Sequence, residues 1–191
     1  MTLAEQLEKY ACFNEQEEKD KEILMHFAKA DNAWTRDNTV AHFTASAWVV
    51  NQDFTKVLMC YHNLYHSWSW LGGHADGDAD LHHVAQKEVM EESGLTHVKF
   101  LSDEPFSIEI LSVDGHMKKG HYVSTHLHLN VTYLMEADPE DAVRNRPEEN
   151  SAVDWIRVDQ IAEKSTEPWF VDHVYAKLCE KMQVKFPRET I

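Results

Sequence analysis

The chain has 191 residues, enough for one domain with a short extension. Its 33 acidic and 18 basic side chains give a formal net charge of −15, the wrong sign for neutralising a phosphate backbone, and no run of residues approaches the roughly 18 apolar positions of a membrane-spanning helix. Composition therefore argues against a nucleic-acid polymer and against a membrane as partners.

The first 38 residues predict a helical extension. Thr2 and Glu5 have the spacing of a capping box, and apolar residues with helical periodicity follow them. Asn14 is a suitable N-cap for a second helix, and the glutamates after it suit the positive end of the helix dipole. We therefore expect residues 1–38 to form an N-terminal helical extension and residues 39–191 to form the main domain.

The cysteines and the N-terminal residues indicate the cellular compartment. Cys12, Cys60 and Cys179 lie far apart without a C-x-x-C motif, so they do not indicate a disulfide framework. The opening residues have neither the basic nor the apolar region of a signal peptide. The sequence predicts a reduced, cytoplasmic protein, and it is compatible with a homodimer.

Runs rich in β-branched and aromatic residues predict the strands of a sheet. Two of these runs surround Asn51, Gln52 and Asp53 and are typical of a hairpin. Two more precede a long polar stretch, one follows it, and the tail then keeps helical periodicity. The expected strands are 42–50, 56–61, 106–113, 121–135 and 153–156, the polar stretch is 136–150, and the closing helix is 169–182.

A helix is predicted over residues 81–93, after a loop rich in glycine and aspartate. Asp78 or Asp80 can cap its start, and Gly94 is a natural left-handed stop. Glu88, Glu91 and Glu92 are neighbours on this helix, where like charges cost roughly 0.2–0.5 kcal/mol per pair. A solvated helix face is the usual explanation of such a cluster.

The helical spacing argues against a solvated face. Glu88 and Glu92 share the arc of the apolar residues, where a carboxylate loses water, and the local cation, Lys87, projects to another side. Buried anions need a cation partner. Mg²⁺ or Mn²⁺ would supply one, because both prefer oxygen ligands.

The same segment resembles the signature motif of the Nudix hydrolases, in which a glycine precedes a helix carrying an arginine-glutamate-hydrophobe-x-glutamate-glutamate-x-glycine pattern. The resemblance covers roughly residues 42–158 and implies an α/β fold, namely the family's α/β/α sandwich with a central mixed sheet. Ala79 and Lys87 depart from the pattern, where the family has a glutamate and an arginine that brace the loop on the helix. The matching residues are Gly73, Glu88, Val89, Glu91, Glu92, Gly94 and Leu95.

The resemblance also implies a chemistry. It predicts a divalent-metal-dependent hydrolase that cleaves a phosphoanhydride in a nucleoside diphosphate linked to another group, or in a related small pyrophosphate. Glu88, Glu91 and Glu92, with the Gly73 carbonyl, are the expected ligands of Mg²⁺ or Mn²⁺. Either Glu88 or Glu149, which precedes the last strand, is the expected general base.

Two other functions stay open. A Nudix-like domain that only binds a nucleotide or metabolite would explain Ala79 and Lys87, although the retained helix glutamates argue against it. An isoprenoid diphosphate isomerase on the same fold would need a cysteine near the glycine loop, and Cys60 is the nearest.

Substrate contacts are expected from a few other side chains. His74 follows Gly73 at the mouth of the expected metal site, and His126 and His128 alternate onto one face of a strand. A zinc site at these two histidines would need a third ligand, which the sequence does not reveal. Trp70 could stack on a flat group of the substrate, although a core position is the favoured explanation of an aromatic residue at a strand end.

Overall fold

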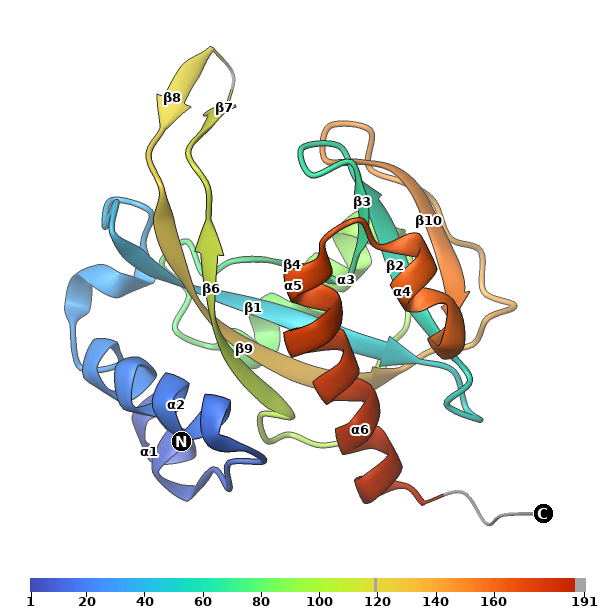
Figure 1. The fold of residues 1–191 in the computed structure, drawn as a ribbon, viewed down its shortest axis with the longest axis horizontal. Helices are drawn as coiled ribbons and strands as arrows, with labels where there is room; N and C mark the ends of the chain where they lie inside the picture. The colour runs from blue at the N-terminus through green and yellow to red at the C-terminus, as the bar shows by residue number, and fades with distance from the viewer. Residues whose placement is uncertain (119, 188–191) are drawn as a thin grey trace. The chain divides into compact units, whose positions relative to one another are not determined.

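The computed structural model describes residues 1–118 and 120–187 (Figure 1). The chain divides into two compact units. The first unit contains residues 1–46, 72–85 and 102–133, and the second contains residues 47–71, 86–101 and the chain from 134 onward. Four elements run from one unit into the other along the chain: β1 (Ala41–Val50), β4 (Leu71–His74), α3 (Leu81–Ser93) and β9 (His126–Glu136). Each unit is described separately below.

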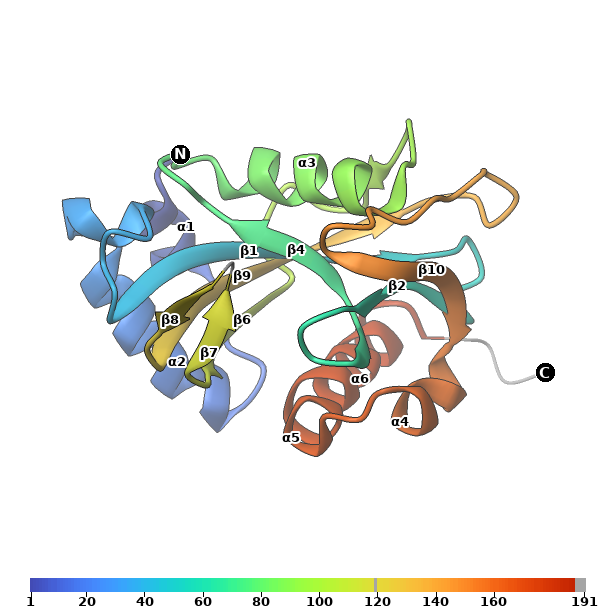
Figure 2. The same ribbon diagram turned by 90° about the horizontal axis from the view of Figure 1, so that it is seen from above.

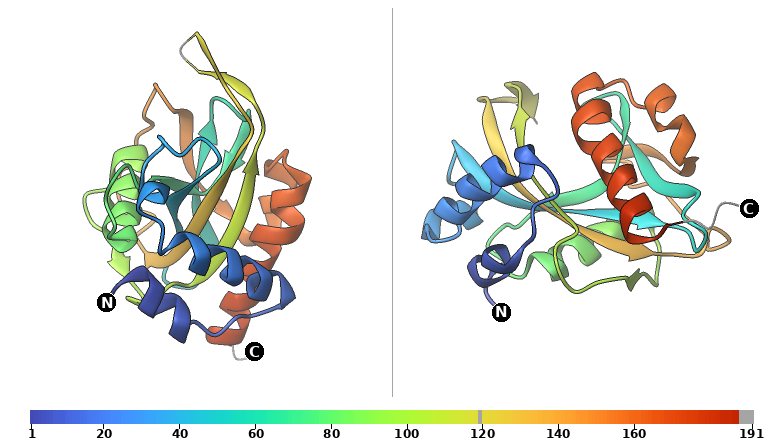
Figure 3. Two further views of the ribbon diagram at one scale, coloured as in Figure 1. Left: turned by 90° about the vertical axis from the view of Figure 1, so that its left-hand side faces the viewer. Right: turned by 60° about the horizontal axis from the view of Figure 1, so that its bottom comes forward.

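The N-terminal helices of the first unit form as the sequence predicts. α1 (Leu3–Lys9) begins with a complete capping box, in which Thr2 and Glu5 each accept a hydrogen bond from the other's backbone N–H. The Asn14 side chain caps α2 (Glu15–Phe27) and accepts a hydrogen bond from the Glu17 N–H at 3.0 Å. α1 and α2 contact each other, and α2 packs against β6 (Ser107–Val113) (Figure 3). A short 3-10 helix, η1 (Asp31–Trp34), leads into β1.

The strands of the first unit pair around β1 and β9. β4 (Leu71–His74) pairs with β1, and β6 pairs antiparallel with β9 so that Ile110 lies opposite Leu129. β7 (His116–Lys118) and β8 (His121–Val123) form a separate hairpin. The prediction of a single strand over 121–135 is therefore wrong in one respect, because the chain makes no strand pairing at 124–125, between β8 and β9. There the Thr125 hydroxyl accepts a hydrogen bond from the Gly115 N–H at 3.1 Å, which takes the place of a ladder bond.

A buried polar network joins α2 to the strands. The carboxylates of Glu17 and Glu109 are both fully buried, and the Ser107 hydroxyl lies between them, 2.9 Å from Glu17. The Asn130 amide donates to Glu109 at 2.9 Å, and the Tyr10 hydroxyl donates to Glu17 at 2.8 Å. Such buried carboxylates are tolerated because hydrogen bonds replace the lost water.

The second unit contains a sheet in the order β10-β2-β1-β9-β5, where β10 is Asn150–Arg157, β2 is Lys56–His62 and β5 is Lys99–Phe100. β3 (Ser67–Ser69) also pairs with β2. The predicted hairpin is confirmed, since β1 and β2 pair antiparallel with Val50 opposite Val57. The Asn51 side chain closes its turn by accepting hydrogen bonds from the backbone N–H groups of Thr55 and Lys56, each at 2.9 Å.

Helices of the C-terminal segment complete the second unit (Figure 2). The predicted closing helix is confirmed, with a π-helical turn inside it that hydropathy periodicity does not reveal. Tyr175, on that turn, stacks on Trp48 with ring centroids 5.8 Å apart and is almost fully buried. No helix in the described part of the chain is long and apolar enough to cross a membrane. The elements are η2 (Val158–Gln160), α4 (Ile161–Lys164), α5 (Pro168–Phe170), η3 (Val171–Tyr175) and α6 (Ala176–Lys185).

Replacing Tyr10 by Phe should destabilise the protein by about 1–3 kcal/mol, because the buried Glu17 carboxylate would lose a donor. For a chain of this size, that loss corresponds to a fall in Tm of roughly 2–4 °C per kcal/mol. Thermal unfolding followed by circular dichroism measures it. Tyr122→Phe, at an exposed tyrosine, is the matched control, and an equal effect in both variants would contradict the expectation.

Candidate functional site

Helix α3 has the limits that the sequence predicts, Leu81–Ser93. The Asp80 carboxylate accepts a hydrogen bond from the His83 N–H at 3.2 Å, as an N-cap residue does. Gly94 ends the helix with a φ of +71°, and a Cβ at this position would collide with the Arg144 side chain. Glycine is required here for its conformation and for the space that it leaves.

The loop before α3 is held by ion pairs within the first unit. Asp76 and Gly77 have φ values of 47° and 94°, and the Arg36 guanidinium donates two hydrogen bonds of 2.7 Å to the Asp76 carboxylate. The Asp78 carboxylate lies 2.7 Å from the His83 ring on the first turn of α3. The loop therefore has braces of its own, although Ala79 cannot supply the family's glutamate.

The paired glycines before this loop allow two strands to approach closely. A Cβ at Gly72 would lie 2.6 Å from the Ala45 carbonyl oxygen of β1, so only glycine fits. Gly73 and His74 follow it on β4. Both belong to the first unit, whereas the glutamates of the candidate metal site belong to the second, and a metal ligand at the Gly73 carbonyl stays a prediction.

The α3 glutamates differ in burial. Glu92 is 4% exposed, Glu88 is half-buried and Glu91 is exposed. The pKa of Glu88 is raised to about 7, chiefly by desolvation; the charge of Lys87 opposes this rise, and the charges of Glu91 and Glu149 contribute to it. Lys87 itself lies 3.9 Å from the Glu91 carboxylate. The sequence placed Glu88 and Glu92 on the apolar side of the helix, and the burial of these two side chains agrees with that prediction.

Arg146 lies between two of the carboxylates, and sequence analysis missed it. Its guanidinium donates to Glu91 at 3.0 Å and lies 3.2 Å from Glu149, so one cation links α3 to the loop before β10. A signal for it was present in the sequence, because an arginine stands three residues before the expected Glu149. Its side chain is 38% exposed, which leaves part of the guanidinium open to a solute.

Backbone contacts fix the position of the loop that carries Glu149. The Arg144 N–H donates to the Ser93 carbonyl at 2.8 Å, and the Asn150 side chain donates to the Glu92 carbonyl at 3.2 Å. The Glu149 carbonyl accepts from the Asn63 N–H at 3.0 Å. Glu149 is half-buried beside Arg146 whereas its neighbour Glu148 is exposed, and a role for Glu149 in the site stays a prediction.

The donor chemistry of these residues fits a hard divalent cation. Carboxylate oxygens are the ligands that Mg²⁺ and Mn²⁺ prefer, and burial of Glu88 and Glu92 raises the need for a positive charge. Among the described residues, no three carboxylates bring their oxygens within 4.8 Å of one another. The carboxylates stay apart because their negative charges repel one another, and because the Arg146 guanidinium lies between those of Glu91 and Glu149.

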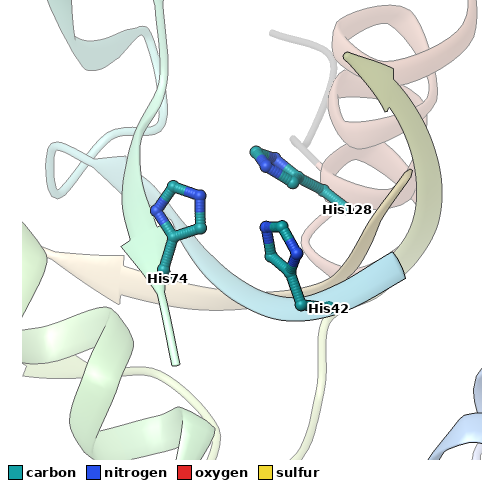
Figure 4. Close-up of side chains that lie close together, drawn as sticks. All are labelled: His42, His74 and His128. Atoms are coloured by element: carbon teal, nitrogen blue, oxygen red, sulfur yellow. The ribbon is translucent and has the colours of Figure 1, made fainter. Parts of the chain in front are cut away.

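The remaining predicted contacts fall into two groups. Trp70 is buried with its ring edge-on to Phe170 and Tyr175, which favours the core interpretation of this tryptophan. His74, His126 and His128 gather in the first unit around a histidine that sequence analysis did not single out, His42 (Figure 4). A substrate contact by any of these side chains stays a prediction.

A surface pocket of about 660 Å³ lies elsewhere in the second unit. Asn51, His97 and Asp138 are among its lining residues, and none of the predicted site residues lines it. Pocket size therefore does not identify the candidate site, which rests on the chemistry of its side chains.

Removing the carboxylate of Asp78 should lower the stability of the loop, because its contact with His83 joins the loop to α3. Both side chains are partly exposed, so Asp78→Ala should cost about 0.2–1 kcal/mol. Thermal unfolding measures the change, with Asp114→Ala at an exposed aspartate as control. Adding the family's brace through Ala79→Glu and Lys87→Arg should then give little further stabilisation.

The sequence matches one family model, described as the NUDIX domain, over residues 40–178, well over half of the chain. No curated protein matches it. Solved structures share the fold at low identity. A Caenorhabditis elegans Ap4A hydrolase in a binary complex is 17% identical, with a TM-score of 0.53 over 75% of this chain and 96% of that one.

Two further structures give the same result. RenU, a Nudix hydrolase of Mycobacterium smegmatis, is 14% identical, with a TM-score of 0.54 over 78% of this chain and 90% of that one. The Escherichia coli dihydroneopterin triphosphate pyrophosphohydrolase is 13% identical, with a TM-score of 0.53 over 75% and 95%. The expected α/β fold class, a central mixed sheet with flanking helices and N-terminal helices in addition, is confirmed. With its glycine loop and the glutamates of α3 in the register of the family motif, the chain belongs to the Nudix family of pyrophosphohydrolases.

Proposed function

We propose that this protein is a divalent-metal-dependent hydrolase of a small phosphoanhydride, a nucleoside diphosphate linked to another group or a related pyrophosphate. The observation that carries the proposal is the cluster of Glu88, Glu91 and Glu92 on α3, of which two are desolvated, with Glu149 held beside them by Arg146. A structural helix face would not need three adjacent carboxylates, two of which have lost water.

Metal binding is assigned to the helix glutamates. Glu88, Glu91 and Glu92 would hold Mg²⁺ or Mn²⁺, with the Gly73 carbonyl as a further ligand. When bound, such a cation neutralises negative charge on the phosphoanhydride and polarises its phosphoryl oxygens. Arg146 supports the same task, because a guanidinium forms paired hydrogen bonds with phosphate oxygens as readily as with carboxylates.

The general base is Glu88 or Glu149. Burial raises the pKa of Glu88 to about 7, which suits a carboxylate that must accept a proton from water near neutral pH. Glu149 is half-buried on a loop that is fastened at both ends to neighbouring backbone, so its carboxylate is held close to Arg146. Either glutamate would accept the proton of the attacking water as the bridging P–O bond breaks.

The substrate class follows from charge and size. An acidic chain does not suit a nucleic-acid polymer, whereas a small pyrophosphate can be bound through cations. Two of the similar structures carry names of enzymes that act on Ap4A and on dihydroneopterin triphosphate, both phosphoanhydrides, and this resemblance supports the class without selecting a member. His74, His126, His128 and Trp70 stay candidates for substrate contacts. A cytoplasmic location and a homodimer also stay predictions.

A panel of substrates tests the proposed hydrolysis. Nucleoside diphosphate conjugates, nucleoside triphosphates and dinucleoside polyphosphates are incubated with the protein and Mg²⁺ or Mn²⁺, and phosphate-containing products are measured. Glu88→Gln should lower the rate on the best substrate by about 10²–10⁴-fold, because it removes a metal ligand and a candidate base while keeping the shape. Binding of a nucleotide without turnover by wild type would instead support the binding module.

Metal binding has its own measurement. Mn²⁺ titrated into wild type and into Glu92→Gln by calorimetry should bind the variant more weakly, because Glu92 is the most buried carboxylate of the cluster. Glu148→Gln, at an exposed glutamate, is the matched control. Equal affinity in wild type and Glu92→Gln would contradict the assignment.

Glu149 should act on turnover more than on metal affinity, because it lies on the loop and not on α3. We expect Glu149→Gln to lower kcat while the calorimetric Mn²⁺ affinity stays close to that of wild type, in contrast with Glu92→Gln. Loss of activity in Glu148→Gln alone would place the active carboxylate one residue earlier. Full activity in both variants would leave Glu88 as the base.

A further inference from the structure

Three histidines from strands far apart in the sequence converge in the first unit. His42 lies on β1, His74 on β4 and His128 on β9, and Figure 4 shows their rings facing a common space. One ring nitrogen of each lies within 4.8 Å of the others. Among the described residues, no other three histidine, cysteine or carboxylate side chains come so close.

His42 has an unused nitrogen directed into the protein. Its ring is 4% exposed, and its Nδ1 lies 3.0 Å from the Asn38 carbonyl, which can only accept a hydrogen bond. Nδ1 therefore carries the proton, and the lone pair of the neutral ring is on Nε2. That Nε2 is buried and has no hydrogen-bond partner in the described part of the chain. A buried polar atom without a partner costs free energy, so a missing ligand is its simplest explanation.

The neighbouring His126 fixes the protonation of His128. Its Nδ1 lies 2.8 Å from the Ser124 carbonyl and must donate, which leaves Nε2 as the acceptor in the neutral ring. His128 Nε2, at 3.3 Å, then donates to it, and His128 keeps a lone pair on its other nitrogen. Metal-binding histidines commonly have one nitrogen oriented in this way by an outer partner.

Burial of the three rings disfavours the charged imidazolium, and the neutral ring is the form that binds a metal. Burial, followed by the charge of Arg36, lowers the pKa of His74 to about 3, and burial also lowers the pKa values of His42 and His128. The cations that face the group are Arg36, which is paired with Asp76, and Lys118.

We propose that His42, His74 and His128 form a binding site for a divalent transition-metal ion, with zinc as the occupant. Three imidazoles suit Zn²⁺ because it is a borderline acid that takes nitrogen ligands, whereas Mg²⁺ and Mn²⁺ prefer the oxygens of α3. In a tetrahedral site with Zn–N distances of about 2.0–2.1 Å the nitrogens are about 3.4 Å apart, so the rings close by up to about 1.4 Å on binding.

Three neutral ligands leave the charge of the zinc ion uncompensated and one position open. The fourth ligand is therefore an anion or water, and a phosphate oxygen is an anion of the right class. The assignment of zinc does not depend on the proposed hydrolysis, since it rests on the His42, His74 and His128 geometry alone.

Zinc titration tests the site. The protein is stripped with a chelator, and Zn²⁺ is added in competition with a chromophoric chelator while excess Mg²⁺ saturates the carboxylates. Wild type should bind one zinc ion per chain, and His74→Ala and His128→Ala should each weaken binding by about 100-fold or more. Both histidines are half-buried, so these variants disturb folding less than a change at His42, and circular dichroism verifies their folds.

Two controls separate this site from other histidines and from the glutamates. His121→Ala, at an exposed histidine of β8, and Glu92→Gln should both keep wild-type zinc affinity. Co²⁺ in place of zinc should give intense visible d–d bands typical of tetrahedral nitrogen coordination, and these should be absent in His128→Ala. Equal zinc affinity in wild type, His74→Ala and His128→Ala, or no stoichiometric zinc in wild type, would overturn the proposal, whatever the hydrolysis assay shows.

Discussion

Burial of negative charge on α3 is the constraint on which the candidate site depends. Glu92 is almost fully buried and Glu88 is half-buried, so the helix carries carboxylates that water no longer stabilises. Arg146 offsets part of this cost by bridging Glu91 and Glu149, and in doing so it ties the loop before β10 to the helix. Backbone hydrogen bonds hold the same loop, so the position of the fourth carboxylate is set by structure as well as by charge.

Buried carboxylates in the first unit are surrounded by neutral hydrogen-bond donors. Glu17 and Glu109 receive hydrogen bonds from Tyr10, Ser107 and Asn130, so neutral donors replace the water that they lose. Such a network stabilises a core and needs no ion. On α3 the exposed Glu91 has an ammonium and a guanidinium beside it, from Lys87 and Arg146, and a metal ion or a phosphate could compete for these contacts.

Local patterns predicted a large part of this structure, because they depend on residues close in sequence. The capping box at Thr2, the Asn14 cap, the limits of α3 and the left-handed Gly94 all follow from neighbouring residues. The break at 124–125 was not predicted, since it depends on the Thr125 hydroxyl binding the backbone of Gly115, ten residues away. Arg146 was missed for the same reason: its partner Glu91 is 55 residues away.

His42 is the clearest example of a site residue that the sequence alone could not identify. Alternation along β9 identified His126 and His128 as a pair, but only His128 belongs to the three-histidine cluster, and the other two nitrogens come from other strands. β1 and β4 each carry a single histidine, so only the strand pairing brings His42 and His74 to His128. Strand pairing thus gathers nitrogen donors within the first unit that no local pattern of the sequence joins, and imidazole nitrogens suit zinc better than they suit the magnesium that carboxylate oxygens prefer.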